Sequence, residues 1–328
     1  MSFNTANTPH QVTNRVMMIR PKAFGYNSET AVDNAFQISS INNCSSSEAS
    51  AQAVREFDDL SHLLSSNGIE VNIEADTDSP ETPDAVFPNN WISFHSSTEI
   101  KLQTTSTIII YPMMSILRRQ ERRQDLIDKW TRSLNASIID LSSFESSGQY
   151  LEGTGSMVLD RVHRVAYACV SGRTDIEMIE KFCSITGYKS VTFRACHKSL
   201  NGDLVPIYHT NVMMMIGKTI SLICLEAIQD SEEKERVMKS LGASGRTIVT
   251  VTVSQMNDFL CNALELSNQD GKRFLVMSTK AYNAMDGNQK RILTEENELE
   301  LVHCSVDTIE SLGGGGVRCM IAEIFPPK

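Results

Sequence analysis

The chain of 328 residues and 36.5 kDa is 41% hydrophobic and 21% charged, proportions typical of a globular protein with an ample core. A net charge of −10 and a pI near 5.3 argue against a protein that binds nucleic acid through a basic face. Eight cysteines without any CxxC pair argue against both a disulfide framework and a structural zinc site.

The start of the chain lacks the pattern of a signal peptide, and no apolar run reaches membrane-spanning length. We therefore expect a cytoplasmic protein. Residues 1–13 are expected to form a flexible head. Residues 14–328 are expected to form a single domain, because no long polar linker divides them.

The first elements are a strand over 15–20 and a helix that begins after residues 45–48, Ser-Ser-Ser-Glu, which have the pattern of a capping box. The helix carries its apolar residues on one face and ends at Asn67-Gly68. Residues 69–75 then alternate in polarity as a half-buried strand does. The basic run 118–123 is interpreted as a solvated helix face rather than a phosphate site.

Four later segments repeat one pattern, in which a strand-like stretch, a helix and a short β-rich run follow one another. The helices are expected at 119–134, 174–186, 230–241 and 279–296, and the β-rich runs at 137–141, 189–194, 246–252 and 299–303. Successive helices are about sixty residues apart, which predicts five strand–strand–helix–strand units. This α/β pattern favours a five-bladed propeller with pseudo-fivefold symmetry. The alternative is an open doubly wound sheet, but no glycine fingerprint follows the first strand.

The run Gly313-Gly-Gly-Gly316 lies just before Cys319, near the C-terminus. Glycine lets the backbone approach a ligand closely and adopt positive φ, so the thiol would be held against whatever this loop surrounds. The alternative is a flexible linker followed by a buried strand cysteine.

Three other segments place polar side chains before apolar runs, and they contain Asn89 and Asn90, Glu152, and His209 with Asn211. A thiol, an imidazole and a carboxylate are the groups that nucleophilic catalysis by cysteine needs. Each residue also has an ordinary explanation: a turn residue for the glutamate, a satisfied core residue for the histidine, and an Asx turn for the two asparagines.

Taken in order, four blocks resemble the guanidino-group-modifying enzymes, which include arginine deiminases, dimethylarginine dimethylaminohydrolases and amidinotransferases. The blocks are Asp84-Ala-Val-Phe-Pro-Asn-Asn90, Glu152-Gly-Thr-Gly, His209-Thr-Asn211 and the glycine run with Cys319. The resemblance extends from Arg20 to Phe325. It implies a five-bladed α/β propeller (the pentein fold), an amino-acid substrate and no cofactor or metal. A homo-oligomer is left open.

The resemblance also implies roles for individual residues. Cys319 would be the nucleophile, His209 the general acid and base, and Glu152 the group that holds substrate nitrogens or steadies the imidazole. We expect Cys319 to be a thiol of low pKa that reacts first among the eight. Substrate binding is expected from Asp84, Phe87, Asn89, Asn90, Asn211, Gly315 and Gly316, with Phe36, Gln37 and Asn262 as looser candidates.

Two positions depart from the deiminase pattern, because Asn90 and Asn211 stand where aspartates are expected. A guanidinium offers only donors and is normally bound by carboxylates, whereas an amide suits a neutral ureido group. The chain is most similar to the citrulline-hydrolysing branch, although Gly316 stands where we expect a serine. The resemblance implies that citrulline and water give ornithine, ammonia and carbon dioxide through a thiocarbamoyl intermediate on Cys319. The alternatives are hydrolysis of arginine or methylarginine, and a non-enzymatic binding protein of the same fold.

Overall fold

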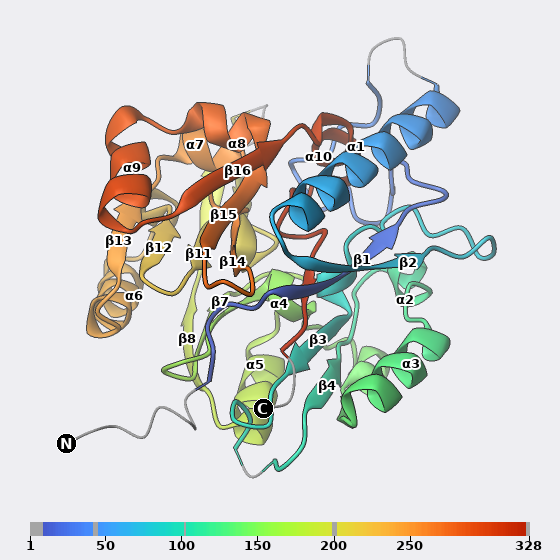
Figure 1. The fold of residues 1–328 in the computed structure, drawn as a ribbon, viewed down its shortest axis with the longest axis horizontal. Helices are drawn as coiled ribbons and strands as arrows, with labels where there is room; N and C mark the ends of the chain where they lie inside the picture. The colour runs from blue at the N-terminus through green and yellow to red at the C-terminus, as the bar shows by residue number, and fades with distance from the viewer. Residues whose placement is uncertain (1–8, 42–44, 102, 199–201, 326–328) are drawn as a thin grey trace.

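The computed structural model describes residues 9–41, 45–101, 103–198 and 202–325 (Figure 1). Its framework is five three-stranded sheets, with one additional two-stranded hairpin. In each three-stranded sheet the middle strand runs antiparallel to one neighbour and parallel to the other. The predicted strand–strand–helix–strand unit therefore occurs five times.

The strands follow the chain order within every sheet except the first, which the C-terminal strand completes. The sheets are β17 (Ala322–Glu323), β1 (Arg15–Arg20) and β2 (Glu70–Ala75); β3 (Ile92–His95), β4 (Thr107–Ile110) and β5 (Ser137–Asp140); β6 (Met157–Asp160), β7 (Val165–Cys169) and β8 (Lys189–Phe193); β11 (Met214–Ile216), β12 (Ile220–Ile223) and β13 (Thr247–Thr250); and β14 (Leu264–Ser267), β15 (Arg273–Ser278) and β16 (Glu300–Cys304), while β9 (Cys196–Lys198) and β10 (Leu204–Pro206) form the hairpin.

A helical crossover joins the second strand of each sheet to its parallel third strand, as parallel pairing requires. The crossover helices are α1 (Ser46–Ser66), α2 (Ile116–Arg119) with α3 (Gln124–Leu134), α5 (Ile176–Thr186), α6 (Ser231–Ala243), and α8 (Thr279–Ala284) with α9 (Gly287–Arg291) and the π-helical turn η6 (Ile292–Glu296). The other helical segments are η2 (Pro88–Asn90), η3 (Ser142–Ser147), α4 (Gly153–Ser156), η4 (Thr210–Val212), η5 (Leu225–Ala227), α7 (Val253–Asn257) and α10 (Asp307–Gly313).

Helix α1 shows how the local sequence sets these elements. The capping box is present as predicted: the Ser45 side chain accepts from the Glu48 backbone N–H, and the Glu48 side chain accepts from the N-cap backbone. The helix buries Ala53, Phe57 and Leu60 on one face, within the core shared with the C-terminal segment. The helix predicted over 119–134 instead divides into α2 and α3, which are joined by residues 120–123.

The last strand ties the two ends of the described chain together. Val16 of β1 pairs with Glu323 and Met17 pairs with Ala322 of β17. The first strands of the sheets also contact one another, since β17 lies against β3, β6 against β11, and β11 against β14. The turns that precede these strands are therefore brought to one region of the molecule.

The N-terminal segment corrects the expected domain boundary. The Gln11 side-chain amide donates to the carbonyls of Leu159 and Ile216, and the Thr13 hydroxyl donates to the carbonyl of Ile324. Both side chains are buried. The packed part of the chain therefore begins before residue 14. Residues 1–8 of the predicted head lie outside the described residues.

The seven cysteines in the described ranges are all free thiols, and Cys44 lies outside those ranges. Among the same residues, we find no helix with both the length and the apolar character needed to span a membrane.

Candidate active site

Five equivalent turns, each just before the first strand of a sheet, carry the candidate side chains. Asn90 lies in η2 before β3, Glu152 precedes α4 and β6, and His209 precedes η4 and β11. Asn262 and Cys319 lie before β14 and β17 in the same way. Because the sheets repeat one strand order, the same turn recurs five times and the side chains from distant parts of the sequence meet.

A narrow hollow is lined by several of these side chains. Its lining includes Asp84, Phe87, Asn90, His209, Gly315 and Cys319 from the predicted set, together with Thr30, Asn34, Arg118, Arg173, Tyr208 and Gly313. Asn89 points elsewhere, since its amide donates to the Thr154 hydroxyl at 3.2 Å. Gly316 lies outside the lining as well, against the Asn262 side chain.

Two amides hold the Cys319 sulfur. Asn262 Nδ2 lies 3.3 Å and Asn211 Nδ2 3.4 Å from Cys319 Sγ. Asn262 Oδ1 accepts the backbone N–H of Arg318, so only its NH₂ group is free to face the sulfur. Asn262, a looser candidate from the sequence, thus contacts the thiol directly.

The thiol itself is buried, and burial raises its pKa above the usual value for cysteine, although the two amides and the Arg318 charge act in the opposite direction. The expected low pKa is therefore wrong for this structure, because the sequence could not show how completely the sulfur is removed from water. A buried thiol is protonated at neutral pH and needs a base to become a nucleophile.

His209 is the imidazole in this hollow, and its Nε2 lies 2.8 Å from Glu152 Oε2. Burial lowers the pKa of His209, although Glu152 opposes the shift. Burial alone would raise the pKa of Glu152, but Arg173, His209 and Arg118 together lower it to about 2. The pair is thus a carboxylate beside a neutral imidazole, as a general base requires.

Gly155 permits this close arrangement. A Cβ atom at this position would lie 2.7 Å from His209 Nδ1 and nearer still to Asn90 Nδ2. Any side chain at residue 155 would therefore push the amide and the imidazole apart.

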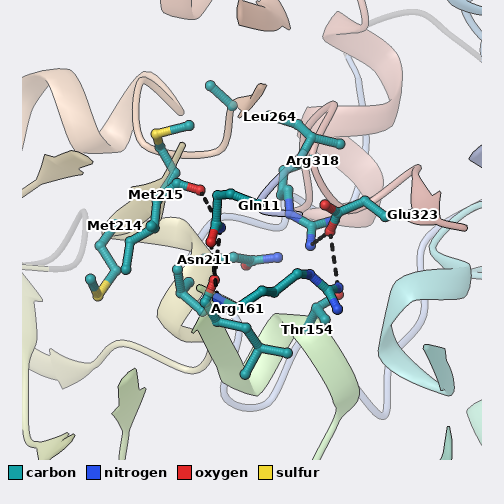
Figure 2. Close-up of a pocket in the computed structure, with 13 residues that line it drawn as sticks. Gln11, Thr154, Arg161, Asn211, Met214, Met215, Leu264, Arg318 and Glu323 are labelled. Atoms are coloured by element: carbon teal, nitrogen blue, oxygen red, sulfur yellow. Dashed lines mark hydrogen bonds and ion pairs between the residues drawn. The ribbon is translucent and has the colours of Figure 1, made fainter. Parts of the chain in front are cut away.

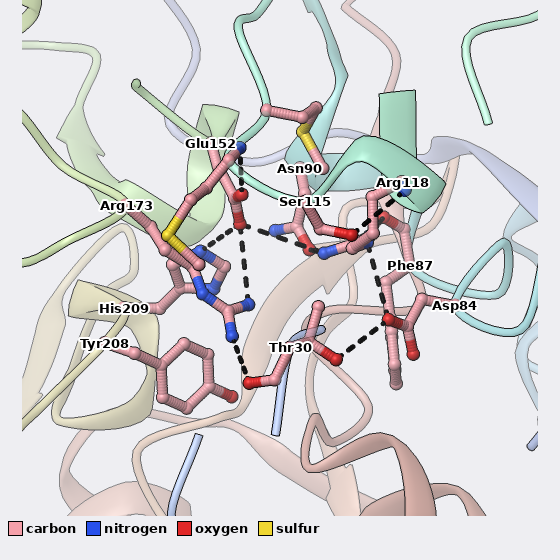
Figure 3. Close-up of polar contacts among 12 residues, drawn as sticks. Thr30, Asp84, Phe87, Asn90, Ser115, Arg118, Glu152, Arg173, Tyr208 and His209 are labelled. Carbon is pink, nitrogen blue, oxygen red and sulfur yellow. Dashed lines mark hydrogen bonds and ion pairs between the residues drawn. The ribbon is translucent and has the colours of Figure 1, made fainter. Parts of the chain in front are cut away.

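Arg118 fixes the orientation of Asn90, as Figure 3 shows. Its Nη1 donates to Asn90 Oδ1 at 2.8 Å, and its other nitrogens bind both carboxylate oxygens of Glu121. Arginine has only donors, so Asn90 must turn its oxygen towards Arg118. Asn90 Nδ2 is left buried without a hydrogen-bond partner.

The interpretation of residues 118–123 as a solvated face is wrong for Arg118, whose exposed fraction is 3%. Its neighbours Arg119, Arg122 and Arg123 keep side-chain exposures of 26%, 18% and 24%. The four arginines of the run 118–123 look alike in the sequence, which contains no signal that distinguishes the buried one from the others.

Arg173 is a second buried cation that the sequence did not reveal. Its Nε lies 3.0 Å from Asp33 Oδ2, and its Nη1 lies 3.7 Å from Glu152 Oε2. The guanidinium also lies over the Tyr208 ring, whose hydroxyl donates to the Gly314 carbonyl. Asp33 belongs to the segment that follows β1, so its ion pair with Arg173 fixes this segment beside the hollow.

Asp84 is held from the same segment. Asn27 Nδ2 lies 2.8 Å and Thr30 Oγ1 3.3 Å from Asp84 Oδ2. Burial raises the pKa of Asp84, against the effect of Arg118. The two other looser candidates lie apart from the thiol: Gln37 donates to the Leu312 carbonyl, and Phe36 stacks on His197.

Among the described residues, no group of three or more His, Cys, Asp and Glu side chains is placed to hold a metal ion.

The repeated sheets and this cluster define the superfamily of guanidino-group-modifying enzymes, as the sequence blocks predicted. The model of the family described as N,N dimethylarginine dimethylhydrolase, eukaryotic, matches residues 20–326, and the chain belongs to this family. It is accordingly a hydrolase that acts on carbon–nitrogen bonds other than peptide bonds. No curated protein matches the chain in sequence.

Solved structures show the same fold at low identity. The N-terminal domain of ArgZ bound to substrate, an arginine dihydrolase from the ornithine–ammonia cycle in cyanobacteria, has a TM-score of 0.70 and 15% identity over 95% of this chain and 98% of that one. Unliganded AgrE has a TM-score of 0.71 and 16% identity over 95% of this chain and 39% of that one. A dimethylarginine dimethylaminohydrolase adduct with S-methyl-L-thiocitrulline has a TM-score of 0.58 and 13% identity, over 95% and 99%.

Proposed function

We propose that the protein is a cysteine hydrolase of a ureido group, with L-citrulline as its substrate. The observation that carries the proposal is the orientation of Asn90. Its oxygen is taken by Arg118, so it offers the hollow a hydrogen-bond donor. A ureido oxygen accepts such a bond, whereas a guanidinium has no acceptor and would face Nδ2 with another N–H group.

The charges of the site support the same substrate. Arg118 and Arg173 lie within 3.8 Å and 3.7 Å of Glu152, so the carboxylate that would meet a guanidinium is already flanked by two cations. A neutral ureido group adds no third positive charge to this buried cluster.

The proposed chemistry uses the residues named from the sequence. Neutral His209 takes the proton of Cys319 as Sγ attacks the ureido carbon, and the imidazolium then protonates the departing nitrogen. The backbone N–H groups of residues 313–316 are proposed to stabilise the oxyanion. A thiocarbamoyl group remains on Cys319, and water hydrolyses it to carbamate, which breaks down to ammonia and carbon dioxide.

We further infer that the five sheets are the blades of one closed propeller with the hollow at the end of its axis. The described residues would form this single catalytic domain, and the protein would work in the cytoplasm without a cofactor.

Product analysis tests the proposal. Purified protein is incubated separately with L-citrulline and with L-arginine, and ornithine, citrulline and ammonia are quantified. Ornithine and ammonia from citrulline, with arginine unchanged, would support the ureido substrate. Citrulline produced from arginine would overturn it. Cys319→Ser should abolish turnover without unfolding the protein, and retained turnover would exclude the covalent route.

Hydrolysis of arginine or a methylarginine is the second candidate. The family description and the ArgZ title both name proteins that act on arginine or its derivatives, and Glu152 is ionised with a pKa of about 2. Under this reading the Asn90→Asp variant should gain activity on arginine, because a carboxylate pairs with the cation. Loss of citrulline hydrolysis without any gain on arginine would instead favour the ureido substrate.

A further inference from the structure

A second cavity, of about 30 Å³, lies among the first strands of the sheets (Figure 2). Residues of β6, β11, β14 and β17 line it, so it occupies the region in which four of the five sheets meet. Its lining is partly polar and includes Thr154, Arg161, Arg318 and Glu323.

We call this second space the axial cavity. Asn211 connects it to the nucleophile. This side chain lines the cavity, and its Nδ2 lies 3.4 Å from Cys319 Sγ. Asn211 Oδ1 is buried without a hydrogen-bond partner from the protein. An unpaired buried acceptor is costly, so this oxygen favours a donor that the protein does not supply.

Gln11 also lines the axial cavity. Its Nε2 lies 2.9 Å from the Leu159 carbonyl and 3.1 Å from the Ile216 carbonyl, and its Oε1 accepts the Arg161 backbone N–H. The same residue lines a wider hollow on its far side, together with Pro9 and Val12. Gln11 is therefore shared by the axial cavity and this wider hollow.

The cavity has the size and polarity that buried water requires. Arg318 pairs with Glu323 at 2.8 Å, and Arg161 lies 3.7 Å from the same carboxylate. These groups, with Thr154 and Asn211, supply the two to four polar partners that a buried water typically binds.

We propose that the axial cavity supplies the water that hydrolyses the thiocarbamoyl group on Cys319. This inference rests on the proposed function. The remainder of the substrate would fill the outer part of the hollow that His209 and Arg118 line, so water would reach the thioester beside His209 by passing Asn211. The water oxygen bonds to the carbonyl carbon, the carbon–sulfur bond breaks with its electron pair on Sγ, and His209 carries one proton from the water to the sulfur. The products are carbamic acid and the free thiol.

A cavity-filling variant tests the role of the water. Val158 lines the cavity and Val191 does not, and both belong to the β6–β7–β8 sheet with 9% exposure. Val158→Phe is expected to slow hydrolysis of the intermediate by about tenfold or more while its formation changes by less than about twofold. Val191→Phe is the matched control and should change neither step selectively. Rapid quenching with citrulline, followed by intact-protein mass spectrometry, measures the carbamoylated fraction over time.

A crystal structure of the unmodified protein provides a test that needs no turnover. It should show ordered water bonded to Asn211 Oδ1, and a dry cavity would overturn the inference. If citrulline forms no intermediate on the unmodified protein, the proposed function fails and the inference fails with it. If the intermediate forms and Val158→Phe hydrolyses it at the unmodified rate, only the role of the cavity is overturned.

Discussion

Arg118 shows how a single buried residue sets both stability and chemistry. It compensates the charge of Glu121, whose pKa burial raises to about 7, and it orients Asn90. Arg118→Met should therefore lower the free energy of unfolding by about 3–5 kcal/mol, because a buried carboxylate loses its partner. Urea denaturation measures this loss, and Arg123→Met, at a more exposed arginine of the same run, should cost less than about 1 kcal/mol.

A double variant separates the two roles of Arg118. Arg118→Met with Glu121→Gln removes both members of the closest ion pair and should recover part of the stability, since Asp84, 3.7 Å from Arg118, still loses its cation. It should still lose about tenfold or more in kcat/KM on the ureido substrate, because Asn90 is free to turn its oxygen towards the hollow. Full recovery of activity in the double variant would contradict the orienting role.

The buried thiol predicts an unusual pH dependence of labelling. Burial raises the pKa of Cys319, so the thiolate is the minor form below pH 9. Its rate of alkylation by iodoacetamide should rise by about tenfold per pH unit from pH 6 to 9. Peptide mass spectrometry follows Cys319 separately from the other cysteines, and a plateau of its rate near neutral pH would show that the thiol has a low pKa after all.

At the scale of elements, the run of glycines 313–316 forms the end of a helix and the turn after it, and it is not a flexible linker. Helix α10 finishes at Gly313, and Gly314 follows in the left-handed region with φ +63°. All four glycines are buried. A Cβ at residue 314 would overlap the Asn34 amide and lie 2.6 Å from Gln37 Cγ.

A pair of glycine substitutions isolates this overlap. Gly245 has a similar φ of +72° with no other atom within 4 Å of its Cβ position. Gly245→Ala should cost about 1–2 kcal/mol from backbone strain alone. Gly314→Ala should cost more, by about 1–3 kcal/mol from overpacking. Thermal unfolding measures the loss of stability in both variants. Equal losses would show that Asn34 and Gln37, in the segment after β1, move aside at little cost.

At the scale of the whole molecule, Gln11 connects parts of the chain that are far apart in sequence. It bonds to residues 148 and 205 positions away, in the sheets that contain β6 and β11. Gln11→Ala should lower the free energy of unfolding by about 1–3 kcal/mol, because two buried carbonyls lose their donor. Gln52→Ala, at a partly exposed position of α1, should cost no more than about 0.5 kcal/mol in the same denaturation experiment. Equal losses of stability in the two variants would mean that the hydrogen bonds of Gln11 contribute little to the free energy of unfolding.

Sequence by itself determined the repeating elements and half of the residues that line the hollow. The capping box at Ser45, the helix over 176–186 and the blocks around Glu152, His209 and Cys319 are local patterns, because periodicity and short motifs express what neighbouring residues do. Only the tertiary structure decided that Arg118 and Arg173 are buried, that Gln11 belongs to the packed protein, and that the pKa of Cys319 is raised. These properties depend on burial and on contacts between segments far apart in the chain, and no local pattern records them.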